Sequence, residues 1–242
     1  MAGAWKVRDV AAHLVDVTFR RLAFHRDRMI PPAPSRAITS ERDFVNFINT
    51  LNAQWIEVSR RFSPRVLTDL FEKGSLDLAD WFEAFPLEAP ALFGVSWAGE
   101  RESTGWFDVG RDFTELWHHQ EQIRMAVSAP SLADPRYLHA VLEIALRGLP
   151  HAYRDVDAPS GATLVLDIRG SAGGEWTLAR EGKAWALYAG AAPDATTRVR
   201  VSDATAWQLL FNALREEGAS GLQIDGDPKL ATPLLRARSV IV

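Results

Sequence analysis

The spacing of apolar residues changes near Pro150, and this change limits the folds open to the chain more than any other feature. Before it, apolar residues recur at i, i+3 and i+4, the period of helices with one buried face. After it, apolar and polar residues alternate, which is typical of half-buried strands. The 242 residues are 47% hydrophobic, enough to build a core. We therefore predict a mixed fold: a helical bundle in residues 1–152 followed by a small α+β domain in residues 160–242.

Capping residues and breakers predict the limits of the helices in the first part. Val7–Met29 is amphipathic and stops before Pro31, and the pair Ser40 and Asp43 resembles a capping box that begins a second long helix. Ser63-Pro64 predicts the start of a third helix, which we expect Gly74 to end. The remaining expected helices lie at about 76–82, 108–127 and 135–149.

The segment 86–105 has two prolines and three glycines and no clear period. Ordered connections of this length are uncommon unless they cover a site, so it is interpreted as a lid. Beyond residue 150, alternation predicts strands and one further amphipathic helix, followed by a terminal helix that starts at Pro228. The predicted strands are Thr163–Arg169, Glu175–Arg180, Ala184–Tyr188, Thr197–Val201 and Gly221–Ile224, and the helix is Ala204–Arg215. The glycine-rich segment 170–174 is interpreted as the hairpin connection between the first two strands, and Gly182 predicts the hairpin turn between the second and the third.

Composition excludes several classes of partner and chemistry. The net charge of -4 provides no basic field for a nucleic acid or an anionic membrane. The chain has no cysteine, which excludes disulfides, thiolate metal sites and a thiol nucleophile from the protein itself. Neither a signal peptide nor a run of roughly 18 apolar residues is present, so the expected location is the cytoplasm.

Glu115 and His119 lie four residues apart on the strongest predicted helix, about 40° apart on one face. His13 lies in the apolar stripe of the first helix and is expected to face the same interior. Three N/O ligands would leave coordination positions open, as in catalytic metal sites. The alternative is two partly buried histidines satisfied by a carboxylate. His118 is a competing ligand at di-iron spacing, but that site needs a second such motif and the chain has none.

Two motifs resemble those of the DinB-like, mycothiol-dependent maleylpyruvate isomerase family. The first runs from Trp5 to Leu14 and includes His13; the second runs from Glu115 to Arg124 and includes His119. The C-terminal half, with Ile224-Asp-Gly-Asp-Pro228, resembles that family's sterol-carrier-like domain. The resemblance implies that His13, Glu115 and His119 bind a divalent metal. Zinc is expected, although this ligand set also suits nickel or iron.

The chain departs from the family pattern at two places. The aspartate that normally follows the second histidine by three residues is Gln122 here, which changes the groups that polarise the ligands. Such proteins also usually have one more helix before the tryptophan of the first motif. Three explanations stay open: an incomplete bundle, a bundle completed by a partner, for example in a homodimer, or a sequence numbered from a late start.

The resemblance also implies a reaction. A thiol such as mycothiol would bind at the open metal position and add reversibly to a conjugated cis double bond of a small, anionic substrate. Arg215 stands where the family often has a functional arginine, and we expect it to be catalytic; otherwise it is a solvated cation at a helix end. The alternatives are thiol transfer to another electrophile, a hydrolase that uses metal-bound water, and a non-catalytic binding protein for an apolar small molecule with the bundle as its scaffold.

Overall fold

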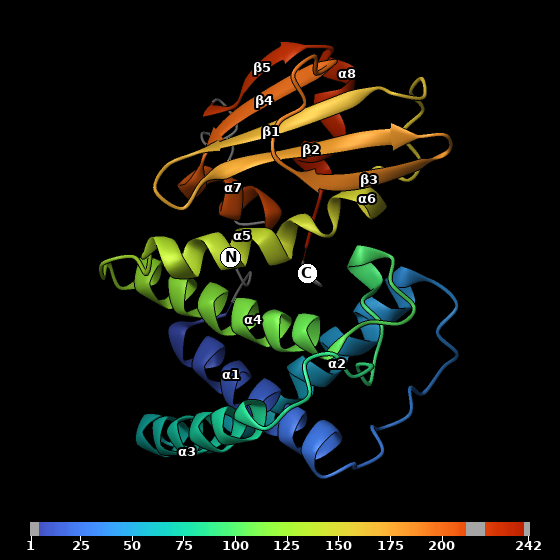
Figure 1. The fold of residues 1–242 in the computed structure, drawn as a ribbon. Helices are drawn as coiled ribbons and strands as arrows, with labels where there is room; N and C mark the ends of the chain where they lie inside the picture. Colours follow the sequence, from blue (N-terminus) through green and yellow to red (C-terminus); the bar gives the residue numbers. More distant parts are fainter. Residues whose placement is uncertain (1–4, 212–220, 240–242) are drawn as a thin grey trace. The chain divides into compact units, whose positions relative to one another are not determined.

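The computed structural model describes residues 5–211 and 221–239, and the chain divides into two compact units. Unit 1 comprises Met1–Leu92, Thr104–Val109 and His118–Pro130, and unit 2 comprises Phe93–Ser103, Gly110–Trp117 and Ser131–Val242. Helix α4 (Gly105–Ala126) contributes residues to both units. Its residues 105–109 and 118–126 are assigned to unit 1, and residues 110–117 to unit 2. The predicted fold class, a helical part followed by an α+β part, is confirmed (Figure 1). The domain limits 1–152 and 160–242 remain a prediction about which parts fold independently.

Unit 1 begins with three long helical segments, and the second and third start at the predicted cap residues. Helix α1 spans Val7–Arg21 and continues as a π-helical turn, η1 (Leu22–Arg26). Helix α2 spans Glu41–Ser59, and its N-cap Ser40 hydroxyl accepts a hydrogen bond from the Asp43 amide at 3.1 Å. Helix α3 spans Pro64–Glu83 after the N-cap Ser63. Their shared apolar core includes Ala12, Val15, Ile56 and Leu67.

Gly74 does not end a helix, which corrects the expected break and the separate short helix after it. Helix α3 runs through this position, and the glycine is buried. A Cβ atom on Gly74 would lie 3.1 Å from side-chain atoms of Thr18 and Phe19 on α1. The absent side chain therefore allows α1 and α3 to approach closely, and this packing outweighs the low helix propensity of glycine.

The segment predicted as a lid contains little regular structure. In unit 1, Pro90 and Thr104 form an isolated bridge, and in unit 2 the 3-10 turn η2 (Ser96–Ala98) lies inside a second bridge between Val95 and Glu100. The buried Val95 and Trp97 anchor that turn. The role of the segment as a lid remains a prediction.

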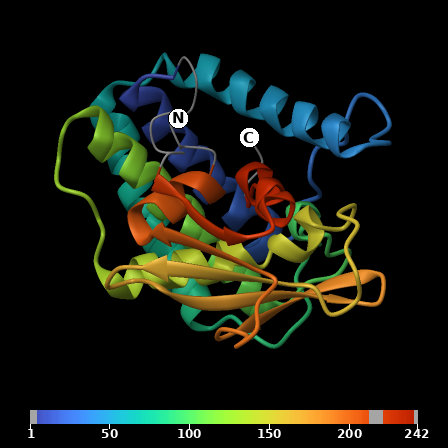
Figure 2. The ribbon, with the colours of Figure 1, turned by 90° about the horizontal axis from the view of Figure 1, so that it is seen from above.

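Unit 2 contains a five-stranded sheet in the order β3-β2-β1-β4-β5 (Figure 1). Figure 2 shows the yellow and orange strands of this sheet from above. β1 pairs in parallel with β4, and the other neighbouring pairs are antiparallel. Gly182, with φ of 60°, turns the hairpin between β2 and β3, and the 170–174 segment joins β1 to β2 as predicted. The strands are β1 (Thr163–Arg169), β2 (Gly174–Glu181), β3 (Ala184–Ala189), β4 (Thr197–Ser202) and β5 (Gln223–Gly226).

The helices of unit 2 share one apolar core with the sheet. Leu164, Leu166 and Ile168 of β1 are at most 2% exposed and belong to the same cluster as apolar residues of the helices. Tyr153 is fully buried, and its hydroxyl donates to the Leu230 carbonyl at 2.7 Å. The helices are α5 (Pro135–Leu146), α6 (Leu149–Ala152), α7 (Asp203–Leu210), α8 (Pro228–Ala231) and the 3-10 turn η4 (Thr232–Arg236).

Within the described residues, every helix is too short or too polar to cross a membrane.

Candidate metal centre

His13 lies in the middle of α1, and the start of this helix is fixed locally. The Lys6 backbone amide donates to the Asp9 carboxylate at 3.0 Å, one half of a capping box. The imidazole of His13 is 5% exposed, and its ring lies 5.2 Å from the ring of Trp5. Helical periodicity therefore places His13 among the buried residues of α1, as its apolar stripe predicted.

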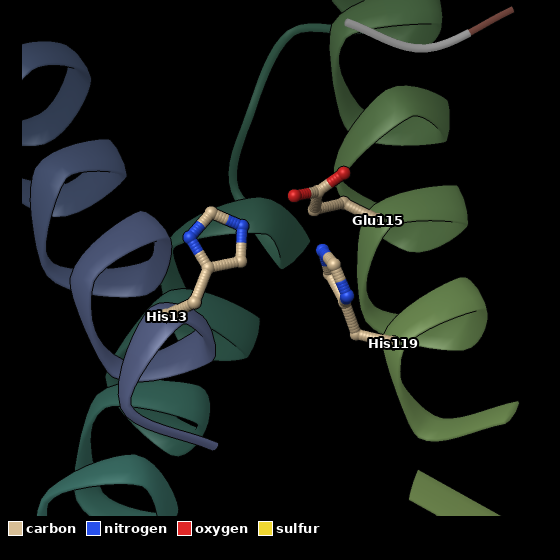
Figure 3. Close-up of side chains that lie close together, drawn as sticks. All are labelled: His13, Glu115 and His119. Carbon is tan, nitrogen blue, oxygen red and sulfur yellow. The ribbon is translucent and has the colours of Figure 1, made fainter. Parts of the chain in front are cut away.

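Glu115 and His119 lie one turn apart on α4, so the helix itself fixes their relative position. Glu115 is partly buried, and the His119 side chain is 8% exposed. Both side chains leave the same face of the helix, toward His13 (Figure 3). The rings of His13 and His119 are in edge contact, with centroids 4.8 Å apart.

The structure thus brings together the three residues that the sequence singled out. One ligand atom from each of His13, Glu115 and His119 lies within 4.8 Å of the other two. Ligands of a tetrahedral zinc ion with bonds of about 2.0–2.1 Å lie roughly 3.3 Å apart, so small side-chain rotations would close the set around one ion. Two neutral nitrogens and one carboxylate oxygen fit a divalent cation such as zinc. Their role as ligands remains a prediction.

Gln122, the departure from the family pattern, is joined to both neighbouring histidines. Its side-chain oxygen lies 2.7 Å from Nδ1 of His119, and its amide nitrogen lies 2.9 Å from Nε2 of His118. Because an amide oxygen only accepts, Nδ1 of His119 carries the proton and Nε2 keeps its lone pair. Gln122 therefore takes the orienting role of an outer-shell partner, without the negative charge of an aspartate.

One of these hydrogen bonds involves His118, the residue considered above as a competing metal ligand. Its Nε2 accepts from Gln122, and the side chain is 6% exposed. Among the described residues, His118 is absent from the group of metal-competent side chains, which contains only His13, Glu115 and His119. The geometry therefore favours the mononuclear arrangement over one that uses His118.

Asp16 follows His13 by three residues, almost one helical turn, and the structure pairs it with Arg20 at 2.9 Å. Burial raises the pKa of the Asp16 carboxyl, while Arg20 and His13 act in the opposite direction. Asp16 thus contributes a partly buried negative charge near His13. Arg124, at the end of the second motif, donates to the Pro130 carbonyl at 2.7 Å.

Arg215, the predicted catalytic residue, lies outside the described residues. The helix predicted at Ala204–Arg215 is present as α7 up to Leu210. Trp106 and Trp117 are close to the predicted ligands in sequence, which suggests that they border a pocket there. Trp117 is 4% exposed and packs edge to face on Trp207 in the core of unit 2. Trp106 is 36% exposed.

Because His25 lies outside the two motifs, the sequence predicts a surface position for it, and this prediction is wrong: the residue is 6% exposed. The π-helical turn η1 places it beside Arg21 and Asp108, with Arg21 Nη1 2.8 Å from both His25 Nε2 and Asp108 Oδ2. The sequence offered one signal, the i, i+4 spacing of Arg21 and His25 on a helix.

The described fold and site define a class of protein: one with a helical unit, an α+β unit and a candidate mononuclear His/Glu/His metal site. The family model described as the mycothiol maleylpyruvate isomerase N-terminal domain matches residues 2–124, more than half of the chain and all three site residues. The chain therefore belongs to the mycothiol maleylpyruvate isomerase N-terminal domain family.

Solved structures are also similar to the chain, and two of them are described here by their identity and overlap. A crystal structure of the mycothiol-dependent maleylpyruvate isomerase is 15% identical, with a TM-score of 0.49 over 92% of this chain and 79% of that one. A histidine-to-alanine mutant of that isomerase is 16% identical, with a TM-score of 0.43 over the same shares. No curated protein matched. The family assignment rests on the family model.

Proposed function

We propose that the chain binds one divalent metal ion, zinc by preference, through His13, Glu115 and His119. We further propose that it catalyses a mycothiol-dependent isomerisation of the maleylpyruvate isomerase type, or a related thiol transfer. The observation that carries this proposal is the convergence of one carboxylate and two imidazoles, within 4.8 Å, from two distant parts of the chain. Membership of the family supports the choice of thiol chemistry.

The donor set suits a catalytic rather than a structural metal. Three protein ligands leave at least one coordination position open. A bound zinc ion would supply Lewis acidity that stabilises a coordinated thiolate at neutral pH. The absence of cysteine from the chain means that this thiol must come from a cosubstrate.

The chain's own residues then have separate roles. His13 and Glu115 hold their side-chain donors toward the shared centre, and Gln122 keeps the proton of His119 on Nδ1, away from it. Trp5 packs against one side of the His13 ring. Arg215 is proposed to hold the substrate carboxylate or the enolate that forms during the reaction.

In the proposed isomerisation, the thiolate sulfur forms a C–S bond with one carbon of a conjugated cis double bond. The electron pair moves onto the conjugated carbonyl oxygen, and the former double bond becomes free to rotate. Reversal breaks the C–S bond, restores the carbonyl and leaves the trans isomer with the thiol unchanged. The proposed substrate is therefore a small, unsaturated carboxylate, and the proposed location is the cytoplasm.

The test is to incubate the zinc-loaded chain with mycothiol and maleylpyruvate and to follow products and free thiol by NMR. A trans product with constant thiol supports isomerisation, and an adduct with stoichiometric loss of thiol supports transfer. The activity should fall to background in His119→Ala and persist in His139→Ala, which removes a half-exposed histidine of unit 2. Neither product from the zinc-loaded wild type would contradict the proposal.

A further inference from the structure

A pocket of about 220 Å³ lies within unit 1, away from the candidate metal centre. His25, in its wall, follows His13 by 12 residues along α1 and η1, a separation of roughly 18 Å at 1.5 Å per residue. We call it the His25 pocket. Its lining includes His25, Arg28, Trp81, Phe85, Ala89 and Leu92.

The wall of the His25 pocket is built from three rings. The rings of His25 and Trp81 meet edge to face with centroids 6.2 Å apart, and Phe85 lies 4.8 Å from Trp81. A Cβ atom on Gly105 would come within 2.6 Å of the Phe85 ring, so the glycine lets the start of α4 support this wall. An aromatic wall of this kind favours a flat apolar ligand.

A buried ion pair holds His25 in this wall. Arg21 and Asp108 lie 2.8 Å apart with side chains that are 10% and 3% exposed, and the His25 Nδ1 atom lies 3.4 Å from the Asp108 carboxylate. His25 belongs to the π-helical turn Leu22–Arg26, a rare geometry that often occurs at functional sites. The positive charge of Arg21 and the negative charge of Asp108 cancel. The net charge of the pocket therefore comes from its other lining residues.

Arg28 supplies that charge. Of the described residues that line the pocket, Arg28 alone is permanently charged. Its φ of 58° is uncommon for a residue with a side chain, and it occurs directly after the π-helical turn. The residue with the strained backbone, Arg28, is therefore also the residue that places a positive charge at the pocket.

We propose that the His25 pocket binds a small molecule with one aromatic ring and one carboxylate. The ring packs against Trp81 and Phe85, and the carboxylate pairs with the guanidinium of Arg28. The size agrees, because an apolar cavity of roughly 150 Å³ is known to hold a benzene ring, and the His25 pocket is somewhat larger. This proposal does not depend on the metal centre or on thiol chemistry.

The test is a calorimetric titration of benzoate, with benzyl alcohol as the neutral comparison, into the full chain after treatment with a chelator. Removing metal keeps the carboxylate from binding at the metal centre. Benzoate is expected to bind the wild type, with a Kd about two- to fivefold higher in Arg28→Gln, the loss expected for one exposed ion pair. Benzyl alcohol should bind the wild type more weakly than benzoate does.

Two further variants locate the binding. Arg136→Gln removes an arginine of unit 2 that is 77% exposed, and it should bind benzoate like the wild type. Ala89→Trp fills the pocket and should abolish binding. Circular dichroism shows whether this variant folds. If it does not fold, the comparison of Arg28→Gln with the wild type decides the test. The proposal is overturned if about 10 mM benzoate gives no binding to the wild type, or if Arg28→Gln and Arg136→Gln bind equally.

Discussion

Replacing Gln122 with leucine should weaken zinc binding by about 10–100-fold, the usual cost of removing a partner that orients a metal ligand. Gln122 is 8% exposed and makes hydrogen bonds of 2.7 Å to His119 and 2.9 Å to His118. Leucine has a similar size but accepts no hydrogen bond. The Nδ1 proton of His119 would lose its acceptor, and the ring would be free to turn or to change tautomer.

The size of the effect follows from the burial of the site. Leaving one buried donor unsatisfied costs about 1–3 kcal/mol. A loss of 10–100-fold in affinity corresponds to about 1.4–2.8 kcal/mol, so the hydrogen bond alone is sufficient to explain it. The matched control is Gln122→Glu, which keeps an acceptor near Nδ1 of His119 and adds a negative charge. Zinc affinity in this control should equal or exceed that of the wild type.

The assay is competition for zinc between the full chain and a chromophoric chelator, with thermal denaturation to show that each variant is folded. If folded Gln122→Leu binds zinc as tightly as the wild type, the assignment of the His119 tautomer is wrong. The same holds if Gln122→Glu loses as much affinity as Gln122→Leu.

Three further predictions concern stability. Zinc at 100 times its Kd should stabilise the wild type by about 2.7 kcal/mol and leave the Tm of His119→Ala unchanged; equal shifts in a melting experiment would count against the site. Gly74→Leu should lower the free energy of unfolding by about 1–3 kcal/mol in urea, since its Cβ would already lie 3.1 Å from α1, and an unchanged value would refute the close-packing role. Asp108→Asn should cost about 3–5 kcal/mol in the same urea assay because Arg21 keeps a buried charge without its counter-ion, and a loss below 1 kcal/mol would show that the pair is not needed.

The sequence was sufficient to predict local structure where a few neighbouring residues determine it. The alternation in Thr163–Arg169 gave the exact limits of β1, and the Ser40 and Asp43 pair gave the start of α2. Turn chemistry worked equally well at Gly182, where a positive φ is required. In each case the interactions that determine the structure lie within one element or one turn. Tertiary packing therefore did not change the local preference of the sequence.

The predictions failed where distant residues decide the local structure. Gly74 looks like a helix end because its propensity is low, but its neighbours Thr18 and Phe19 come from another helix. His25 looks like a surface residue until the π-helical turn and Asp108, 83 residues further along the chain, are known. Neither pattern is visible in a local stretch of sequence.

The geometry of the candidate metal centre could be predicted from the sequence only in part. The spacing of Glu115 and His119 predicts that they share a helix face, and this geometry is confirmed. The apolar stripe of the first helix made His13 available as a third ligand, and the family resemblance added its assignment to the site, because a lone histidine in such a stripe is compatible with several roles. The partners of Gln122 could not be predicted, since the orientation of an amide depends on both histidines around it.

The most direct test of the central claim is the ratio of zinc to protein, measured by mass spectrometry of the metal after equilibration and removal of excess ion. About one ion per chain is expected for the wild type and for His139→Ala, and a ratio near zero is expected for His13→Ala. His13 is the informative position because it comes from α1, far in sequence from the pair on α4. Equal zinc content in all three proteins would contradict the claim that these three side chains bind one ion.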